Sequence, residues 1–221
     1  SYVAATKQNI PKRGRPKNTG VTSRALSREE IKRLLTVTQH TNAQSGNAFR
    51  NAVMVQFGIY TSARISEIAN VKIKDVIEDD KVSNSIVFSQ TKSKKSRRIP
   101  LNPVLQSLLR RFLYDNPYQH TRSEEPQALN LDAPLFPSQK GGHFHPTAAS
   151  KLIKTLLVRA GIPNAGASHV LRKTGLTLLH EQGVSLRTLQ EISGHSNIAT
   201  LQTYLSASEH NVAGAINSLK L

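Results

Sequence analysis

Residues 166–205 constrain the fold more than any other stretch, because they contain helix-start and helix-stop signals in close succession. Ser168 is a favoured N-cap, apolar residues follow it, and Gly183 ends the run, which predicts a helix that begins at His169. The same pattern, a serine cap and a closing glycine, predicts a second helix over residues 185–194. This end of the chain is therefore expected to be helical.

Four chemically capable side chains lie in this stretch. His169 and Arg172 are three residues apart, so they share one face of the first helical turn. A phosphate would be held there by backbone N–H groups, guanidinium and imidazole together. His195 follows the second helix, and Tyr204 comes nine residues later, near the end of a short helical stretch. A lone histidine or tyrosine is more often packed or exposed than catalytic, but the joint spacing favours a site for one phosphodiester.

The strings His-Val-Leu-Arg and Gly-His-Ser, with a tyrosine nine residues after the second histidine, closely resemble the second conserved box of the tyrosine recombinase family. The phage integrases and Xer-like resolvases belong to that family, and the resemblance covers about residues 25–220. It implies site-specific cleavage and rejoining of DNA through a covalent 3′-phosphotyrosyl intermediate, as in integration and recombination of mobile elements. It also implies double-stranded DNA as the partner, tetrameric self-association on DNA, and no cofactor, metal or small-molecule substrate.

The resemblance implies a catalytic role for six positions. They are Tyr204 as nucleophile, His169 as proton acceptor, Lys92 as the acid that protonates the departing 5′ oxygen, Arg64 and Arg172 as a clamp on the non-bridging oxygens, and His195 as a further hydrogen-bond donor. Because free tyrosine has a pKa near 10, its attack needs a group that accepts the proton.

Arg64 lies in the string TSARISEIANVKI, where the family expects an arginine on a turn entering a helix. We expect Thr61 or Ser62 to cap that helix and Arg64 to lie in its first turn. An arginine there is unfavourable unless an anion binds, since the helix dipole prefers negative charge at this end. A surface arginine paired with Glu67 is the alternative, and Glu67 itself is expected to orient a neighbour rather than to act in catalysis.

Residues 76–101 alternate in a way typical of strands, which predicts an antiparallel hairpin with Val82, Ile86, Val87 and Phe88 on one side. Its turn and returning strand are basic and contain no acid. Lys92 lies eight residues before Pro100, where the family places its catalytic lysine, although a shift to Lys94 or Lys95 stays open. The basic side chains expected to contact DNA here are Lys94, Lys95, Arg97 and Arg98.

Helical signals account for most of the remaining chain. A capping box of Ser27 with Glu30 opens the first helix, and further helices are predicted at about 47–60, from Pro103 after an Asn102 cap, and from Pro146 to Gly161. The expected fold is therefore α+β, a mostly α-helical domain with a small antiparallel hairpin at one edge. A last helix at 208–219 would pack on a neighbouring protomer, as the family implies, or within its own chain.

Composition bears on partners more than on fold. The 221 residues contain 30 Lys and Arg against 14 Asp and Glu, a formal charge of +16, which attracts polyanions, nucleic acid first and anionic membrane second. No apolar run approaches the roughly 18 residues that span a bilayer, so no membrane integration is expected. The absence of cysteine is compatible with a cytoplasmic, nucleoid-associated protein. The sequence also has no carboxylate cluster such as a two-metal nuclease uses.

Residues 1–24 are rich in proline, glycine and cations, which predicts a flexible basic arm ahead of a catalytic domain at 25–221. The run KRGRPK, with Lys12, Arg13 and Arg15, resembles a minor-groove AT-hook, although an interdomain linker is the more ordinary reading. Family members usually carry a separate helical DNA-binding domain before this point. None fits here, which leaves open that the chain is a fragment.

Lys173, Gly175 and two histidines are further features of the sequence. Lys173 and Gly175 depart from the family, which commonly has His-Thr and then Phe or Ala after the arginine. The lysine adds a possible phosphate contact, and the glycine, which is costly in a helix, implies close packing or the close approach of a ligand. His143 and His145 could bind a metal, but no third ligand is evident. The alternatives to a recombinase are a type IB topoisomerase, which relaxes DNA without strand exchange, and a DNA-binding regulator that no longer cuts.

Overall fold

The computed structural model describes residues 23–40, 46–89, 95–115 and 128–205, together with positions 216, 217 and 219. Several expectations fall outside these ranges. They are the arm with Lys12, Arg13 and Arg15, the hairpin tip with Lys92 and Lys94, and most of the predicted helix at 208–219.

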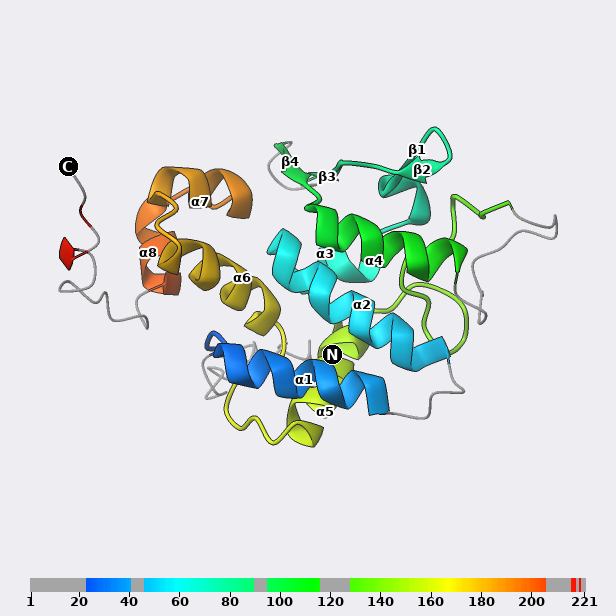
Figure 1. The fold of residues 1–221 in the computed structure, drawn as a ribbon, viewed down its shortest axis with the longest axis horizontal. Helices are drawn as coiled ribbons and strands as arrows, with labels where there is room; N and C mark the ends of the chain where they lie inside the picture. Colours follow the sequence, from blue (N-terminus) through cyan, green and yellow to red (C-terminus); the bar gives the residue numbers. More distant parts are fainter. Residues whose placement is uncertain are drawn as a thin grey trace, which may run out of the picture.

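Helices form most of the described chain (Figure 1). They are α1 (Arg28–His40), α2 (Gly46–Thr61), α3 (Ile65–Asn70), α4 (Pro103–Tyr114), α5 (Pro146–Arg159), α6 (Val170–Glu181), α7 (Leu186–Ser193) and α8 (Ile198–Leu205), with a 3₁₀ turn at Ile73–Asp75. The strands are β1 (Ile77–Glu78), β2 (Lys81–Val82), β3 (Ser85–Ser89) and β4 (Ser96–Pro100). They pair as two antiparallel hairpins, β1 with β2 and β3 with β4, which confirms the predicted α+β class. None of the described helices is long and apolar enough to cross a membrane.

Most predicted helix starts are confirmed by the side chains that cap them. Ser27 and Glu30 form a reciprocal capping box before α1, with bonds of 3.1 and 2.9 Å. The Asn102 side chain accepts the Leu105 N–H at 2.8 Å before α4. The predicted cap of α6 is wrong by one residue, since His169 rather than Ser168 occupies the N-cap position and α6 begins at Val170.

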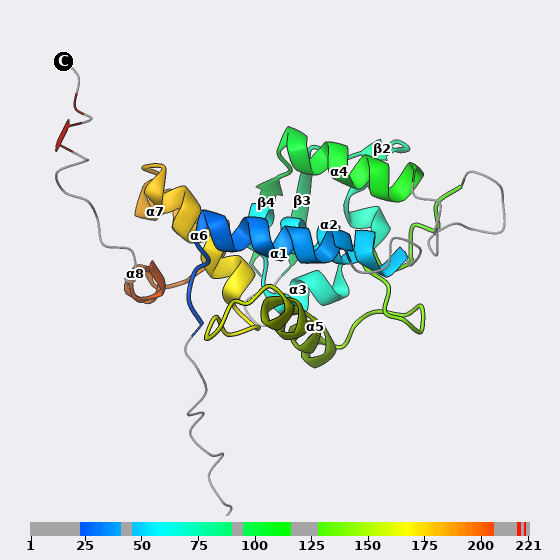
Figure 2. The ribbon, with the colours of Figure 1, turned by 60° about the horizontal axis from the view of Figure 1, so that its bottom comes forward.

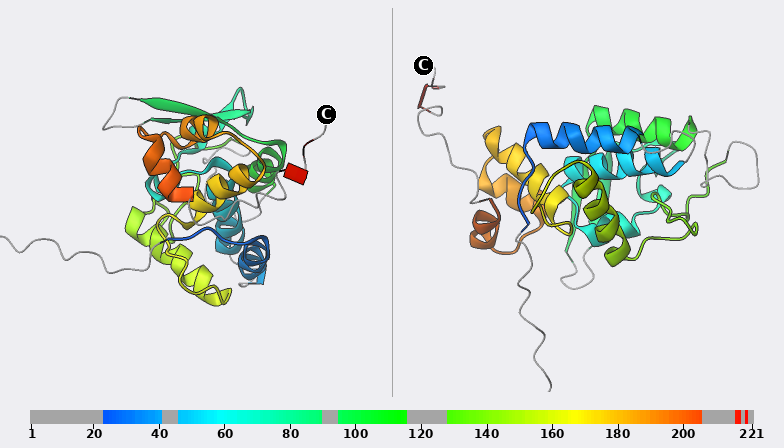
Figure 3. Two further views of the ribbon diagram at one scale, coloured as in Figure 1. Left: turned by 90° about the vertical axis from the view of Figure 1, so that its left-hand side faces the viewer. Right: turned by 90° about the horizontal axis from the view of Figure 1, so that it is seen from below.

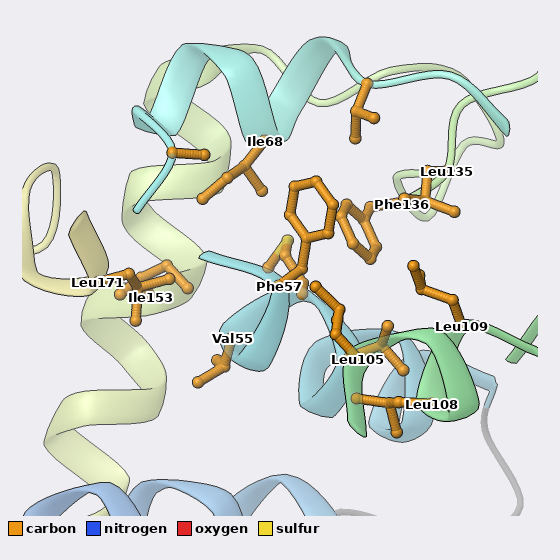
Figure 4. Packing of buried hydrophobic residues seen from close by; sticks show 14 of the residues in the cluster. Val55, Phe57, Ile68, Leu105, Leu108, Leu109, Leu135, Phe136, Ile153 and Leu171 are labelled. Carbon is orange, nitrogen blue, oxygen red and sulfur yellow. The ribbon is translucent and has the colours of Figure 1, made fainter. Parts of the chain in front are cut away.

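Helix α2 lies in the middle of the molecule, with α4 above it and α5 below in Figures 1 and 2. It packs against α1, α3, α4 and α6. Phe57 of α2 meets Phe136 and Phe88 edge to face, with ring centroids 5.4 and 6.3 Å apart, and Figure 4 shows the first of these pairs. This apolar core fixes the end of α2, where the chain turns into α3.

The β3–β4 hairpin lies at one edge of the molecule, beside α7 (Figure 3). Ile86 pairs with Ile99 across the two strands, and both side chains are buried. The prediction that Val87 shares a face with Ile86 and Phe88 is wrong, because successive strand residues point to opposite faces and Val87 is 40% exposed.

A second, smaller apolar cluster forms between α6, α7 and α8, which gather at the left of Figure 1. It consists of the buried residues Leu176, Leu189, Leu201 and Leu205. The core around α2 extends to the turn that precedes Arg64. The smaller cluster packs α8, the helix that contains Tyr204.

Close packing between α2 and α6 explains Gly175. A Cβ at this position would lie 2.6 Å from Ser62 Oγ and closer still to the Ile59 carbonyl oxygen. Any larger residue would push the two helices apart. The glycine therefore brings the first turns of α6 next to the α2–α3 turn.

Candidate active site

Arg64 is the N-cap residue of α3, immediately after the α2–α3 turn. The predicted cap at Thr61 or Ser62 is wrong, because Thr61 still belongs to α2. Glu67 accepts the Arg64 main-chain N–H at 2.8 Å and pairs with its Nη1 at 3.1 Å. Arg64 therefore both pairs with Glu67 and lies at the entry of a helix, two placements that the sequence offered as alternatives.

Arg172 is almost fully buried, at 3% exposed, and is held by main-chain carbonyls. Its Nη1 donates to the Ser62 oxygen at 2.9 Å and its Nη2 to the Ser193 oxygen at 2.5 Å. Burial lowers the pKa of Arg172 to about 10, so the guanidinium stays charged at neutral pH. One side chain of α6 thus fixes the turn before Arg64 and the end of α7 at the same time.

Tyr204 lies close to two histidine rings. Its ring centroid is 6.3 Å from that of His169, at an interplanar angle of 90°, and 5.4 Å from that of His195. The Tyr204 hydroxyl donates to the His169 main-chain oxygen at 3.5 Å. The His195 Nδ1 lies 2.6 Å from Ser193 Oγ, which fixes the ring just beyond α7.

The electrostatics of this cluster favour neutral imidazoles. Burial, together with the nearby cations Arg172 and Arg64, lowers the pKa of His195 to about 4. Burial and the same two arginines, with Lys173, also lower the pKa of His169. Burial raises the pKa of Tyr204, although Arg172 and Arg64 oppose that rise. Near neutral pH the site therefore combines a protonated phenol with imidazoles that can accept a proton.

Arg97 does not lie on the surface where a DNA-contacting residue of the hairpin was expected. Its side chain is 7% exposed and forms a two-point ion pair with Glu67 at 2.6 and 2.7 Å. Its Nε donates to the Ile192 oxygen of α7 at 2.9 Å, and the guanidinium lies 4.8 Å from the Phe88 ring centroid. Arg97 therefore ties the hairpin to α3 and α7.

A groove of about 760 Å³ opens between the hairpin and α7. Lys95 and Arg98 line it on the hairpin side and Arg187 on the α7 side, and Arg64 and His195 also belong to its lining. Arg187 was not predicted from the sequence as part of this surface. Its local signal there is the spacing of four residues from Glu191, and the two side chains form an exposed ion pair at 3.8 Å. The groove thus joins a cationic surface to His195, which contacts Tyr204.

The remaining candidates have other partners. The Lys173 Nζ donates to the Ser23 main-chain oxygen at 2.7 Å. His143 Nδ1 lies 3.1 Å from the Ala69 oxygen, and His145 caps α5 by accepting the Thr147 N–H at 3.3 Å. Within the described ranges, no group of three residues could hold a metal ion.

Residues 24–211 match the model of the phage integrase family, and the chain belongs to this family. It is 31% identical over 201 residues to the tyrosine recombinase XerA of Thermococcus kodakarensis, covering 90% of this chain and 63% of that protein. It is 29% identical over 211 residues to the tyrosine recombinase XerD of Caulobacter vibrioides, covering 94% and 64%. It is 28% identical over 180 residues to the tyrosine recombinase XerH of Campylobacter jejuni, covering 81% and 47%. The chain thus spans roughly half to two thirds of these relatives.

Solved structures agree on the fold. The crystal structure of XerA recombinase superposes with a TM-score of 0.68 at 24% identity, covering 89% of this chain and 66% of that one. The structure of XerH site-specific recombinase bound to palindromic difH substrate gives 0.63 at 23% identity, covering 99% and 59%. The mostly helical domain with a basic hairpin at its edge is therefore the catalytic-domain fold of these recombinases.

Proposed function

We propose that the protein cleaves and rejoins DNA strands at specific sites through a covalent 3′-phosphotyrosyl intermediate, in integration or recombination. The observation that carries this proposal is the position of Tyr204 close to both His169 and His195 and near the buried Arg172. Membership of the phage integrase family and the named activity of its Xer relatives support the same reaction.

In the proposed reaction the Tyr204 oxygen attacks the phosphorus and the bond to the 5′ oxygen breaks. The phenolic proton goes to His169, whose lowered pKa leaves it able to accept. Lys92, outside the described residues, is proposed to give a proton to the departing 5′ oxygen. The reverse sequence, with a 5′ hydroxyl from another strand, rejoins the DNA and releases the tyrosine.

Arg64 and Arg172 are proposed to stabilise the negative charge on the non-bridging oxygens, with His195 as a further donor. Donors fixed before the reaction act most strongly where water is excluded. Arg172 fits this requirement because two carbonyls already hold its guanidinium in a buried position. Neutral His195 can donate one ring N–H without adding charge.

Double-stranded DNA is the proposed partner, bound along the groove between the hairpin and α7. Lys95 and Arg98 line that groove, and Lys94 with the arm residues Lys12, Arg13 and Arg15 would extend the contact. Phosphate contacts of this kind release counterions, so binding should weaken steeply with salt. We further propose that the protein acts on the cytoplasmic nucleoid as a tetramer, with the segment at 208–219 docked on a neighbouring protomer.

A DNA duplex nicked close to the scissile phosphate tests the proposal. The short strand beyond the nick diffuses away after attack, so a covalent protein–DNA adduct accumulates. The wild type should form the adduct and Tyr204→Phe should not, while Tyr60→Phe, a matched change at a tyrosine that is 41% exposed, should behave as the wild type. Absence of a Tyr204-dependent adduct would favour the non-cutting regulator. Relaxation of supercoiled plasmid by the isolated protein, without paired sites, would favour the topoisomerase.

A further inference from the structure

Lys173 lies between the start of the described chain and Tyr204. Its Nζ donates to the Ser23 main-chain oxygen at 2.7 Å and is 5.3 Å from the centroid of the Tyr204 ring. That distance is within the range at which an ammonium is attracted to an aromatic face. The same ammonium thus contacts an acceptor before α1 and the residue on α8 proposed as the nucleophile.

The acceptor is itself fixed in place. Ser23 Oγ donates to the carbonyl oxygens of Ala165 and Gly166 at 3.2 and 3.1 Å, and the Arg24 N–H donates to Ala165 at 3.0 Å. Gly166 adopts a φ of +67°, and a Cβ there would lie 2.8 Å from Ser23 Cα. We call residues 23–26 the strap, because they cross the loop that leads into α6.

The strap also holds α6 directly. The Leu26 N–H donates to Thr174 Oγ1 at 2.9 Å, in a buried position one residue after Lys173. The Ser23 main-chain oxygen, which accepts from the Lys173 ammonium, therefore belongs to a segment that is hydrogen-bonded both to the loop before α6 and to α6 itself. An ammonium bound to such a segment has little freedom to move.

The contact between Lys173 and the Tyr204 ring is important because open space lies next to the ring. A cavity of about 460 Å³ lies beside Tyr204, and its other lining residues are 24–27, Glu30, Lys173, Thr177, Glu181 and Leu205. Apolar packing does not fill this flank of the ring, so the Lys173 ammonium supplies a contact that packing would otherwise provide. Partial burial lowers the pKa of Lys173, and its ammonium is directed to the Ser23 oxygen.

We infer that Lys173 is a positioning residue that fixes the orientation of the Tyr204 ring by linking it to the strap. This inference rests on the proposed strand-cleavage function. It gives Lys173 a role different from the DNA-phosphate contact expected from the sequence. The lysine would act through the tyrosine and not on the DNA.

The test compares Lys173→Met, Lys173→Arg and the control Lys81→Met, an exposed lysine of the distant β2 strand. The single-turnover rate of adduct formation is measured at saturating nicked DNA, and the dissociation constant for the same DNA is measured separately. We expect Lys173→Met to slow the saturated rate about tenfold, equivalent to about 1.4 kcal/mol. Its dissociation constant should stay within about twofold of wild type. Lys173→Arg, which keeps a cation over the ring, should recover most of the rate.

A second readout needs no DNA. In protein labelled with 3-fluorotyrosine, the Tyr204 fluorine resonance is assigned by its loss in Tyr204→Phe. It should shift in Lys173→Met and stay unchanged in Lys81→Met. An unmoved resonance, or weaker DNA binding with an unchanged saturated rate, would overturn the inference. If the wild type forms no adduct but the resonance still shifts, the strand-cleavage proposal fails and the positioning of the ring stands.

Discussion

Arg97 and Glu67 face each other as a two-point ion pair, with Nη1 2.6 Å from Oε1 and Nη2 2.7 Å from Oε2. The same carboxylate pairs with Arg64, so it stands between an arginine of the hairpin and an arginine of the candidate site. Because Arg97 also donates to the Ile192 oxygen, three elements meet at one guanidinium. The pair therefore governs both stability and the geometry around Arg64.

Arg97→Met should destabilise the domain strongly. The two side chains are 7% and 13% exposed, and loss of one partner leaves the carboxylate buried without its main counter-charge. Breaking a buried pair in this way costs about 3–5 kcal/mol. Urea unfolding measures the loss. Arg98→Met, one residue along the same strand and exposed, is the matched control and should change stability little. The double variant Arg97→Met with Glu67→Gln should recover part of the loss, and failure to do so would show that the charge of Glu67 is not the cause.

Acid should destabilise the fold through His195. The unfolded pKa of histidine is about 6.5, whereas burial and the facing cations lower the folded pKa of His195 to about 4. Between about pH 6.5 and 4 the unfolded state therefore binds a proton at His195 that the folded state does not bind. The stability that the neutral His195 contributes is present above about pH 6.5 and is lost as the pH falls toward 4. The surrounding groups are Arg172, Arg64, Arg97 and His169. Chemical unfolding from pH 7 to 4 should show a shallower loss in His195→Asn than in wild type, and identical slopes would refute the assignment.

Ser62→Gly should stabilise the domain. Ser62 has a φ of 53°, in the left-handed region that disfavours side chains, and is fully buried. Its hydroxyl has no hydrogen-bond partner within the described residues. Glycine relieves both costs, offset in part by its greater freedom when unfolded, for a net gain of about 1 kcal/mol. The melting temperature should rise by about 2–4 °C. DNA cleavage should persist, since the carbonyl that holds Arg172 remains, and a lower melting temperature would contradict the argument.

Gly175→Ala should destabilise the protein although alanine favours helices by about 1 kcal/mol. The new methyl group would overlap the Ile59 carbonyl and crowd Ser62 Oγ, and neither the backbone nor a fully buried side chain can move away cheaply. Gly142→Ala is the matched control, because nothing lies within 4 Å of its added methyl group. Thermal melts of the two variants should separate clearly, and equal melting temperatures would argue against close α2–α6 packing.

Local chemistry made much of the fold predictable. The Ser27, Asn102 and Ser185 caps and the left-handed Gly194 were read from the sequence because each depends on one side chain and its near neighbours. Close packing was also one of the two explanations that the sequence offered for Gly175, because a glycine inside a helix needs a compensating contact.

The partners of the site residues were not predictable in the same way. Arg172 is held by two main-chain carbonyls, and every residue has a carbonyl, so no sequence pattern marks the two that are used. The burial of Arg97 depends on Glu67, thirty positions away. The error at Val87 came from treating a continuous apolar run as one face, although strand geometry alternates.

The four-leucine cluster between α6, α7 and α8 has a consequence for local stability. So small a core can melt while the aromatic centre around Phe57 stays intact, as a separate cooperative unit. Native-state hydrogen exchange should then show the amides of α8 exchanging before those of α2. Tyr204, which lies on α8, could then leave the site and return at a fraction of the free energy of global unfolding, while the core around α2 stays folded.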